Sequence, residues 1–430
     1  MTGTMIGYGI SAISLPILTR IYSPEDFSVL ASFTAIVSIL AVSASLRFNV
    51  AISIPTSRAI ASDLLRISIL VAAASSFIVA AVLLIFQNSI SSLLSQPRLS
   101  DQFWLIPIAV FLAATFSTFQ FWHVREQKFK VIAKARVLQS FLASGIQISL
   151  GILGFSPFGL VFGYSMNNGT GAVYLGQSAL TKTLFSPLRR NRVKRIFAAY
   201  KHYPKYSSLE ALLNTISTSL PILLIGSLSS DPVTGHLALA VAVLQAPMAL
   251  LGGSISQVFL SRAPIENRNG TLVQYSSEVL TWLFRACIGP LVALAILAPD
   301  FFRVLFGENW ERSGELVRWM VPWYVLQFAV SPISMALYVK KHLLTALLLQ
   351  FFGALLRSAS ILVVFFVGSN LFAESYALSG LVFYLIYLIV VLRVIAIPLK
   401  TIFKNLVYTT PILVLCIAIA LVLSVVLKGV

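Results

Sequence analysis

The chain has 430 residues, of which 58% are hydrophobic and only 10% are charged, and its formal net charge is +17. Soluble domains carry about 25% charged residues, so this composition cannot cover a soluble surface. We therefore predict an all-α, polytopic membrane protein, and the positive charge does not require a nucleic-acid partner. The two cysteines, Cys287 and Cys416, lie in apolar runs and indicate neither a disulfide framework nor a metal site.

A membrane-spanning helix needs about 20 apolar residues, and thirteen stretches meet this length, within an expected 12–14 spans. In chain order they are 4–22, 27–54, 66–86, 103–122, 137–155, 157–180, 209–230, 235–260, 279–298, 316–338, 343–366, 372–394 and 407–427. No basic residue precedes the first stretch, so no cleavable signal peptide is expected, and whether Met1 is the natural start is left open. The sequences Phe155-Ser156-Pro157 and Ser230-Asp231-Pro232 predict tight reversals.

The basic residues concentrate in every second loop, which predicts the orientation of the chain. If the N-terminus lies in the cytoplasm, most of the 31 Lys and Arg fall in cytoplasmic loops, including the loop after the fourth span with Arg125, Lys128, Lys130, Lys134 and Arg136. The positive-inside rule therefore places the N-terminus inside and, with thirteen spans, the C-terminus outside. The stretch SPLRRNRVKRIFAAYKHYPKYSS at 186–208 becomes the middle cytoplasmic loop, where each basic residue gains about 1 kcal/mol near anionic headgroups.

A weak internal repeat predicts how the spans are grouped. SPEDFSVLASFTAIVSIL after the first span resembles SSDPVTGHLALAVAVLQ after the seventh, at an offset of about 207 residues. This favours two six-helix lobes around a central cavity, at 1–180 and 209–397, joined by a basic linker at 181–208 and followed by an additional helix in 398–430. Transporters built from such parallel repeats place the substrate path between the halves. An ordinary helical bundle with a chance resemblance is the alternative.

Three arginines fall inside predicted spans: Arg47, Arg285 and Arg357. A charge at this depth costs about 3 kcal/mol, so it usually faces a water-filled cavity or a partner. No acid lies deep enough to pair with all three, and guanidinium groups bind phosphate bidentately, which predicts an anionic ligand. Arg285 is the shallowest of the three, and its side chain could equally snorkel to the interface.

Uncharged polar side chains within the spans could add hydrogen bonds to substrate hydroxyls, although such residues also bridge helices. These cavity candidates are Asn49, Asn214, Gln245 and Gln257, and the two acids at inner helix ends, Glu210 and Glu278, are candidates for ion coupling. The four His residues have no metal-ligand spacing, and no phosphate-binding loop for ATP occurs. We therefore expect no metal, no cofactor and no catalytic residue.

Several segments, in order, resemble the polysaccharide transport proteins, the O-antigen (oligosaccharide) flippase family of the multidrug/oligosaccharidyl-lipid/polysaccharide exporter superfamily. They are LPILTRIYSPEDFSVLASF, LRFNVAISIPTS, YPKYSSLEALLNTISTSLPILLIG, ALAVAVLQAPMALLGGSISQVFLSRA and FGENWERSGELVRWMVPWYVLQFAVSPIS. The resemblance implies translocation of undecaprenyl-pyrophosphate-linked oligosaccharide units by alternating access, in a bacterial inner membrane, for lipopolysaccharide O-antigen, capsule or exopolysaccharide. It implies ion gradients in place of ATP, places Arg47 on the family's basic position in the second span, and suggests other polysaccharide-assembly membrane proteins as partners.

Three other functions stay open at this stage. A drug or small-cation exporter of the same superfamily would want acids in its cavity, whereas the deep charge here is positive. A membrane enzyme of polysaccharide assembly usually needs a sizeable periplasmic loop, which this sequence lacks. A scaffold subunit without transport of its own is the third alternative.

Overall fold

The computed structural model describes residues 2–179, 190–229, 232–248, 253–340, 342–398 and 410–428, and these residues form helices and no strand. Eight helical stretches among them are long and apolar enough to cross a membrane, accompanied by three shorter apolar helices. The predicted all-α, polytopic fold class is confirmed. Of the two predicted reversals, Ser230-Asp231-Pro232 includes residues outside the described ranges.

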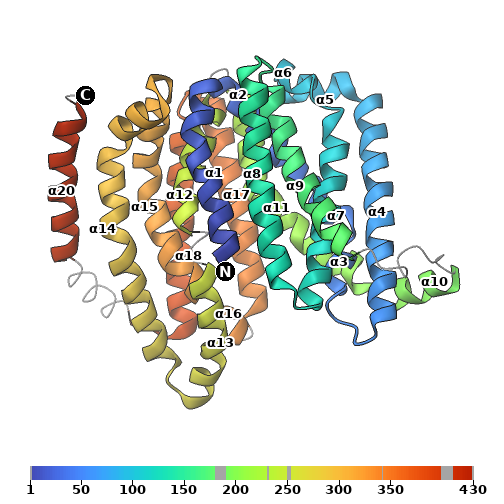
Figure 1. The fold of residues 1–430 in the computed structure, drawn as a ribbon. Coiled ribbons are helices and arrows are strands. Elements are labelled where there is room, and N and C mark those ends of the chain that lie inside the picture. The colour runs from blue at the N-terminus through green and yellow to red at the C-terminus, as the bar shows by residue number, and fades with distance from the viewer. Residues whose placement is uncertain are drawn as a thin grey trace. The chain divides into compact units, whose positions relative to one another are not determined.

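The chain forms two compact units, Met1–Ser230 and Asp231–Val430. The helices of the first unit are α1 (Thr2–Ile21), α2 (Pro24–Ala44), α3 (Phe48–Ala51), α4 (Arg58–Ile85), α5 (Gln87–Leu94), α6 (Pro97–Ser100), α7 (Leu105–Arg125), α8 (Phe129–Ile152), α9 (Phe158–Ala179), α10 (Arg190–Ala199) and α11 (Ser208–Leu228). Helix α7 is central, because α2, α4 and α9 all pack against it, while α8 packs between α1 and α9 and α11 packs along α2 (Figure 1).

The helices of the second unit are α12 (Val233–Pro247), α13 (Gly253–Asn269), α14 (Leu272–Phe306), α15 (Glu311–Ile333), α16 (Ala336–Val339), α17 (Leu343–Val367), α18 (Phe372–Ile395) and α20 (Thr410–Lys428). Helix α15 packs against α12, α14 and α18, and α17 packs against α18. These four pairs match the pairs α7–α2, α7–α4, α7–α9 and α8–α9 of the first unit. The second unit therefore repeats the neighbour pattern of the first, as the sequence repeat suggests. Helix α11, the first helix of the second half by sequence, packs in the first unit.

The turn between α1 and α2 illustrates how short signals fix the helix ends. Ser23 caps α2 by accepting from the backbone N–H of Asp26, and the Asp26 carboxylate accepts from the backbone N–H of Ser23, with Pro24 at the first helical position. Tyr22 donates to the carbonyl of Gln147 on α8 at 2.7 Å. Burial and the nearby Asp26 raise the pKa of Tyr22 to about 12, so its hydroxyl stays a donor at neutral pH.

The reversal predicted at Phe155-Ser156-Pro157 is confirmed. Gly154 adopts a φ of +82° directly after α8, where a residue with a Cβ would be strained, and the backbone N–H of Phe155 donates to the carbonyl of Leu150. Helix α9 starts three residues later, at Phe158.

Several predicted boundaries are wrong. The stretch 27–54 is not one helix, because α2 ends at Ala44 and a separate short helix, α3, begins at Phe48. Helix α8 begins at Phe129, eight residues before the predicted start, because the basic residues of this segment do not prevent helix formation. Helix α14 extends beyond both ends of the predicted span 279–298. The described part of the basic stretch 186–208 is largely helical, with α10 followed by a π-helical turn at Tyr203–Ser207.

Candidate functional site

Arg47 lies at the break between α2 and α3. Leu46 and Arg47 both adopt left-handed backbone conformations, with φ of +48° and +59°. Such conformations are costly for residues with a Cβ, and they persist where the surroundings hold them in place. Here the following residues Phe48 and Asn49 are buried and anchor α3. The break therefore displaces Arg47 from a regular helix position, which the continuous apolar pattern gave no reason to expect.

The polar groups around Arg47 are only partly satisfied. The side-chain amide of Asn49 donates to the hydroxyl of Ser117 on α7 at 2.9 Å. The Nε of Arg47 and the Oδ1 of Asn49 are buried, and neither has a hydrogen-bond partner among the described residues. Glu210, an exposed residue in the first turn of α11, lies close enough to Arg47 to interact with it electrostatically. Arg47 and Asn49, both predicted cavity candidates, are therefore brought together with Glu210, a predicted coupling candidate.

Arg136 is a further guanidinium within a helix of the first unit, and the sequence prediction placed it in a loop. It lies two turns into α8, and its guanidinium donates to the side-chain carbonyl of Gln120 on α7 at 3.1 Å. The guanidinium carbon lies 4.8 Å from the centre of the Phe116 ring. No carboxylate of the described residues forms an ion pair with it. Arg136 could be recognised as a helix residue only if the start of α8 were known, and the sequence pattern does not show where α8 begins.

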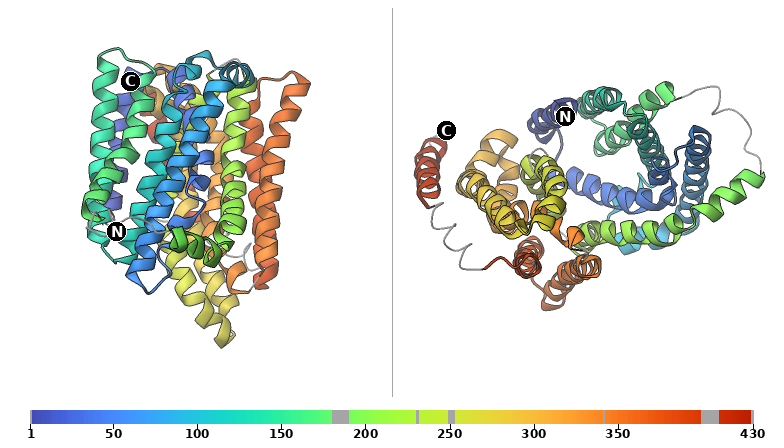
Figure 2. Two further views of the ribbon diagram at one scale, coloured as in Figure 1. Left: turned by 90° about the vertical axis from the view of Figure 1, so that its right-hand side faces the viewer. Right: turned by 90° about the horizontal axis from the view of Figure 1, so that it is seen from below.

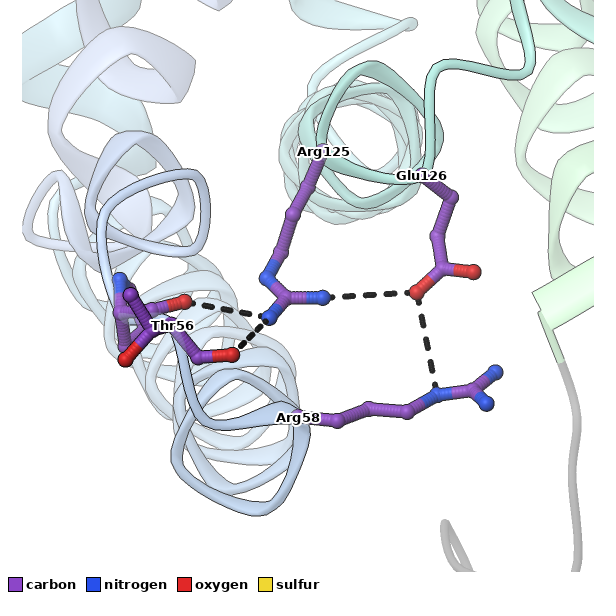
Figure 3. A network of polar contacts seen from close by, with 5 residues as sticks. Thr56, Arg58, Arg125 and Glu126 are labelled. Carbon is purple, nitrogen blue, oxygen red and sulfur yellow. Dashed lines mark hydrogen bonds and ion pairs between the residues drawn. The ribbon is translucent and has the colours of Figure 1, made fainter.

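A network of charges lies where α7 ends and α4 begins, shown in Figure 3. Glu126 lies 3.4 Å from Arg125 and 3.7 Å from Arg58, and Arg125 also donates to the backbone carbonyls of Pro55 and Thr56. These contacts bind the segment between α3 and α4 to the end of α7. They therefore help to fix α3, which carries Asn49.

Helix α10 docks on the same end of the first unit, where it lies across the long axis of α4 in both Figure 1 and the left view of Figure 2. Ile196 is buried against the cluster that contains Phe48, and the Phe197 ring lies edge-on to the Phe48 ring with 4.9 Å between their centres. Arg192 forms an ion pair with the buried Asp63 at 3.7 Å. The basic loop is thus partly an amphipathic helix that packs against Phe48, the residue that follows Arg47.

In the second unit, Arg357 on α17 is almost completely buried, with 6% of its surface exposed. Its guanidinium carbon lies 4.9 Å from the centre of the Phe383 ring and 5.3 Å from the Trp323 ring, which allows cation–π attraction to both. It also donates a hydrogen bond to the Tyr384 hydroxyl. Arg357 is therefore enclosed by aromatic rings, and no carboxylate in the described residues pairs with it.

The packing around this aromatic enclosure depends on small residues. A Cβ added to Gly380 on α18 would lie 2.4 Å from the Trp323 ring, and one added to Gly353 on α17 would lie 2.6 Å from the Phe383 ring. A hydrogen bond joins the side chain of Gln245 on α12 to the Tyr324 hydroxyl. The predicted candidates Arg357 and Gln245 therefore belong to one polar and aromatic cluster in the second unit.

Arg285 and Glu278 occupy a different place in the second unit. Both line an open groove of about 760 Å³ along the first turns of α14, together with Ser277, Thr281 and Trp282. Arg285 is exposed, as expected if it snorkels. Asn214 is exposed on α11, and Gln257 lies in α13 with its side chain outside the described part of the structure. Within the described part of each unit, no ion pair or hydrogen bond joins Asn214 to Arg47, or Arg285 and Glu278 to Arg357.

The comparisons with known proteins agree with this architecture. Residues 17–315 match the family described as polysaccharide biosynthesis protein. No curated protein matches the sequence significantly. Among solved structures, the lipid II flippase MurJ in an inward closed conformation is 12% identical, with a TM-score of 0.77 over 100% of this chain and 96% of that one.

Two further solved structures belong to the MOP superfamily. An inward-facing multidrug resistance MATE family transporter is 14% identical, with a TM-score of 0.70 over 90% of this chain and 94% of that one. A transporter from Pyrococcus furiosus, described by the reverse polarity of its binding pocket, is 16% identical. Its TM-score is 0.56 over 92% of this chain and 94% of that one. Identities this low establish the fold alone. Because the family match covers more than half of the chain, the protein belongs to the polysaccharide biosynthesis protein family, as a multi-pass membrane protein with the fold of MOP superfamily transporters.

Proposed function

We propose that the protein is a flippase that moves undecaprenyl-pyrophosphate-linked oligosaccharide units across a bacterial inner membrane, for lipopolysaccharide O-antigen, capsule or exopolysaccharide synthesis. The family match and the transporter fold support this class of function. The observation that carries the substrate proposal is Arg47, whose buried Nε lacks a partner among the described residues.

The pyrophosphate is the part of such a substrate that is hardest to move through hydrocarbon, because its charges lose their hydration. A guanidinium can replace part of that hydration with charge-assisted hydrogen bonds. Arg47 supplies the charge, and the unpaired Oδ1 of Asn49 could accept from a sugar or water hydroxyl. In this proposal the two lobes, 1–180 and 209–397, alternate access around the substrate, the lipid tail stays in the bilayer, and the N-terminus is cytoplasmic.

The remaining candidates receive separate roles in the proposal. Arg357 contributes positive potential from within its aromatic enclosure instead of direct contact, since it is 6% exposed. Glu210 is the stronger of the two ion-coupling candidates, because it lies near Arg47, whereas Glu278 lies on α14 and accepts a hydrogen bond from Gln274. A cation bound at the Glu210 carboxylate would raise the net positive charge near Arg47, which gives an ion gradient a direct way to alter anion affinity.

A cellular assay of leaflet location tests the proposal. In a deletion strain, the lipid-linked unit should accumulate on the cytoplasmic side, out of reach of a sugar probe confined to the periplasm. The wild-type gene should restore probe access, whereas Arg47→Ala at equal membrane level should not. Lys130→Ala, which removes an exposed charge from the start of α8, is the matched control and should restore access. Normal probe access in the deletion strain would contradict the flippase proposal and favour a later enzymatic step.

A drug exporter is the second candidate, because a multidrug transporter shares the fold. An exporter of cationic drugs needs unpaired acids in its path. The buried acids Asp63 and Asp26 of the first unit are instead held in ion pairs with arginines. Drug resistance that depends on this gene, with unchanged probe access to the lipid-linked unit, would favour the exporter.

A further inference from the structure

We infer that Arg136 is a second phosphate-binding side chain beside Arg47, and that it makes the site prefer a diphosphate over a monophosphate headgroup. This inference rests on the proposed function. It concerns a residue that the sequence analysis counted only as a loop charge.

The first step is the position of Arg136 within the unit. It follows the start of α8 at Phe129 by seven residues, or roughly 10 Å along the helix axis at 1.5 Å per residue. Lys130 and Lys134 on the same helix are exposed, whereas Arg136 is partly buried. A partly buried arginine without an ion-pair partner among the described residues is expected to serve a ligand, because burying an isolated charge is costly.

The second step is the way in which neighbouring residues hold the guanidinium. Gln120 accepts one of its N–H groups, and the Phe116 ring lies beneath its plane. Helix α1 closes in from another side, because a Cβ on Gly7 would lie 3.1 Å from the Arg136 carbonyl oxygen. A guanidinium has five N–H donors, so one accepted bond fixes its direction and leaves donors for a ligand.

The third step is that Arg136 and Arg47 are anchored to the same turn of α7. Asn49, two residues after Arg47, donates to Ser117, and Arg136 donates to Gln120. Residues three apart lie on the same side of a helix, separated by about 4.5 Å along its axis. Ser117 and Gln120 therefore bring the two arginine-bearing segments to nearly the same depth.

The fourth step is chemical. Two arginines on segments anchored to one turn of α7 can each engage one phosphate of a diphosphate, whereas a monophosphate can engage only one of them well. Loss of either arginine should weaken diphosphate binding, and loss of Arg136 should also remove the discrimination between the two headgroups. A merely structural role for Arg136 would leave that discrimination unchanged.

The test uses the purified full-length chain in nanodiscs, with binding of undecaprenyl pyrophosphate and undecaprenyl monophosphate measured by native mass spectrometry. Wild type should prefer the diphosphate. Arg136→Gln should lower the ratio of the two affinities by roughly tenfold, the loss expected for one charge-assisted contact. Lys134→Gln, which removes an exposed charge half a turn away, should leave the ratio unchanged. Binding of phosphatidylglycerol serves as the background measurement, because it reports how strongly the chain binds any anionic lipid.

A second variant keeps the inference testable if Arg136→Gln does not fold. Gln120→Glu retains the arginine but pairs it with a carboxylate, so it should also lower the ratio without loss of thermal stability. An unchanged ratio in whichever of these two variants folds would overturn the inference and leave the proposed function in place. A wild-type protein that binds neither undecaprenyl phosphate would overturn the proposed function and the inference with it.

Discussion

At Arg357 the second unit places a positive charge among aromatic rings instead of beside a carboxylate. The faces of Trp323 and Phe383 and the hydroxyl of Tyr384 surround the guanidinium. Ring faces carry partial negative charge and accept a cation without themselves carrying a full charge. The enclosure therefore lowers the cost of burying the Arg357 guanidinium without a carboxylate beside it.

Two substitutions at Arg357 distinguish what its side-chain volume contributes to the free energy of unfolding from what its charge contributes. Arg357→Ala should lower the free energy of unfolding by about 2–4 kcal/mol, because it leaves a cavity among the rings. Arg357→Met fills most of that volume without a charge and should cost less than about 1.5 kcal/mol, or stabilise the protein. Thermal unfolding in detergent measures both. Equal destabilisation by the two variants would show that the charge, and not the packing, stabilises the enclosure.

At the scale of the element, two helices of the second unit end in the same way with different residues. Gly368 ends α17 with φ of +70°, and Ala396 ends α18 with φ of +71°, each donating its N–H to carbonyls three and four residues back. Both residues are exposed, so only backbone strain distinguishes them. Glycine adopts this conformation without the penalty that alanine carries.

Substitutions at Ala396 and Gly368 should change the stability of the protein in opposite directions. Ala396→Gly should raise the free energy of unfolding by about 0.5–1 kcal/mol, and Gly368→Ala should lower it by a similar amount. The comparison of melting temperatures within one detergent checks both signs. The same sign for both substitutions would mean that a contact beyond the helix end dominates.

Helix α10 is held to α4 by few contacts, of which the Arg192–Asp63 ion pair is one. Asp63 is 6% exposed, so Asp63→Asn should weaken this attachment more than an exposed pair would. Limited trypsin digestion should then cut within 190–205 several-fold faster. Asp101→Asn, at an exposed acid in the segment between α6 and α7, is the control and should leave the rate unchanged. Equal rates for all three proteins would mean that the apolar contacts of Ile196 and Phe197 suffice.

The sequence predicted the helices well and the site only in part, for reasons visible at particular residues. Each of the thirteen predicted spans overlaps a helix, because the length of an apolar stretch can be read directly from the sequence. The break before Arg47 was missed because Leu46 and Arg47 carry no glycine or proline signal. Arg136 was missed because a helix that begins with lysines looks like a loop. The aromatic partners of Arg357 lie on other helices, so only packing could reveal them.

At the scale of the whole molecule, orientation in the membrane is the property that the charge pattern predicts most directly. Cysteine substitutions in a variant without Cys287 and Cys416 can test it. An impermeant thiol reagent added to intact cells should label Ser92→Cys on α5 and leave Lys201→Cys after α10 unlabelled, because the positive-inside rule places only the basic loops in the cytoplasm. Both positions are exposed. Inverted vesicles should give the reverse, and labelling of both positions in intact cells would contradict the predicted orientation.

The repeated neighbour pattern gives each unit its own central helix, α7 in the first and α15 in the second. Each of these helices carries part of a candidate site, Ser117 and Gln120 on α7 and Trp323 and Tyr324 on α15. In the proposed alternating access, each unit would move largely as one body around its own central helix. The domain boundaries at 180 and 209 stay a prediction.

Arg47 and Phe48 are consecutive residues with different surroundings. Arg47 interacts electrostatically with Glu210, and Phe48 packs on Phe197 of the basic helix α10. Thermodynamic linkage between two binding events is reciprocal. If contact of α10 with anionic headgroups changes the affinity of Arg47 for an anion, a bound anion must change the affinity of α10 for headgroups by the same factor. The lipid composition of the inner leaflet would then act as an effector of transport. The coupling would pass from Phe48, which contacts α10, to its neighbour Arg47.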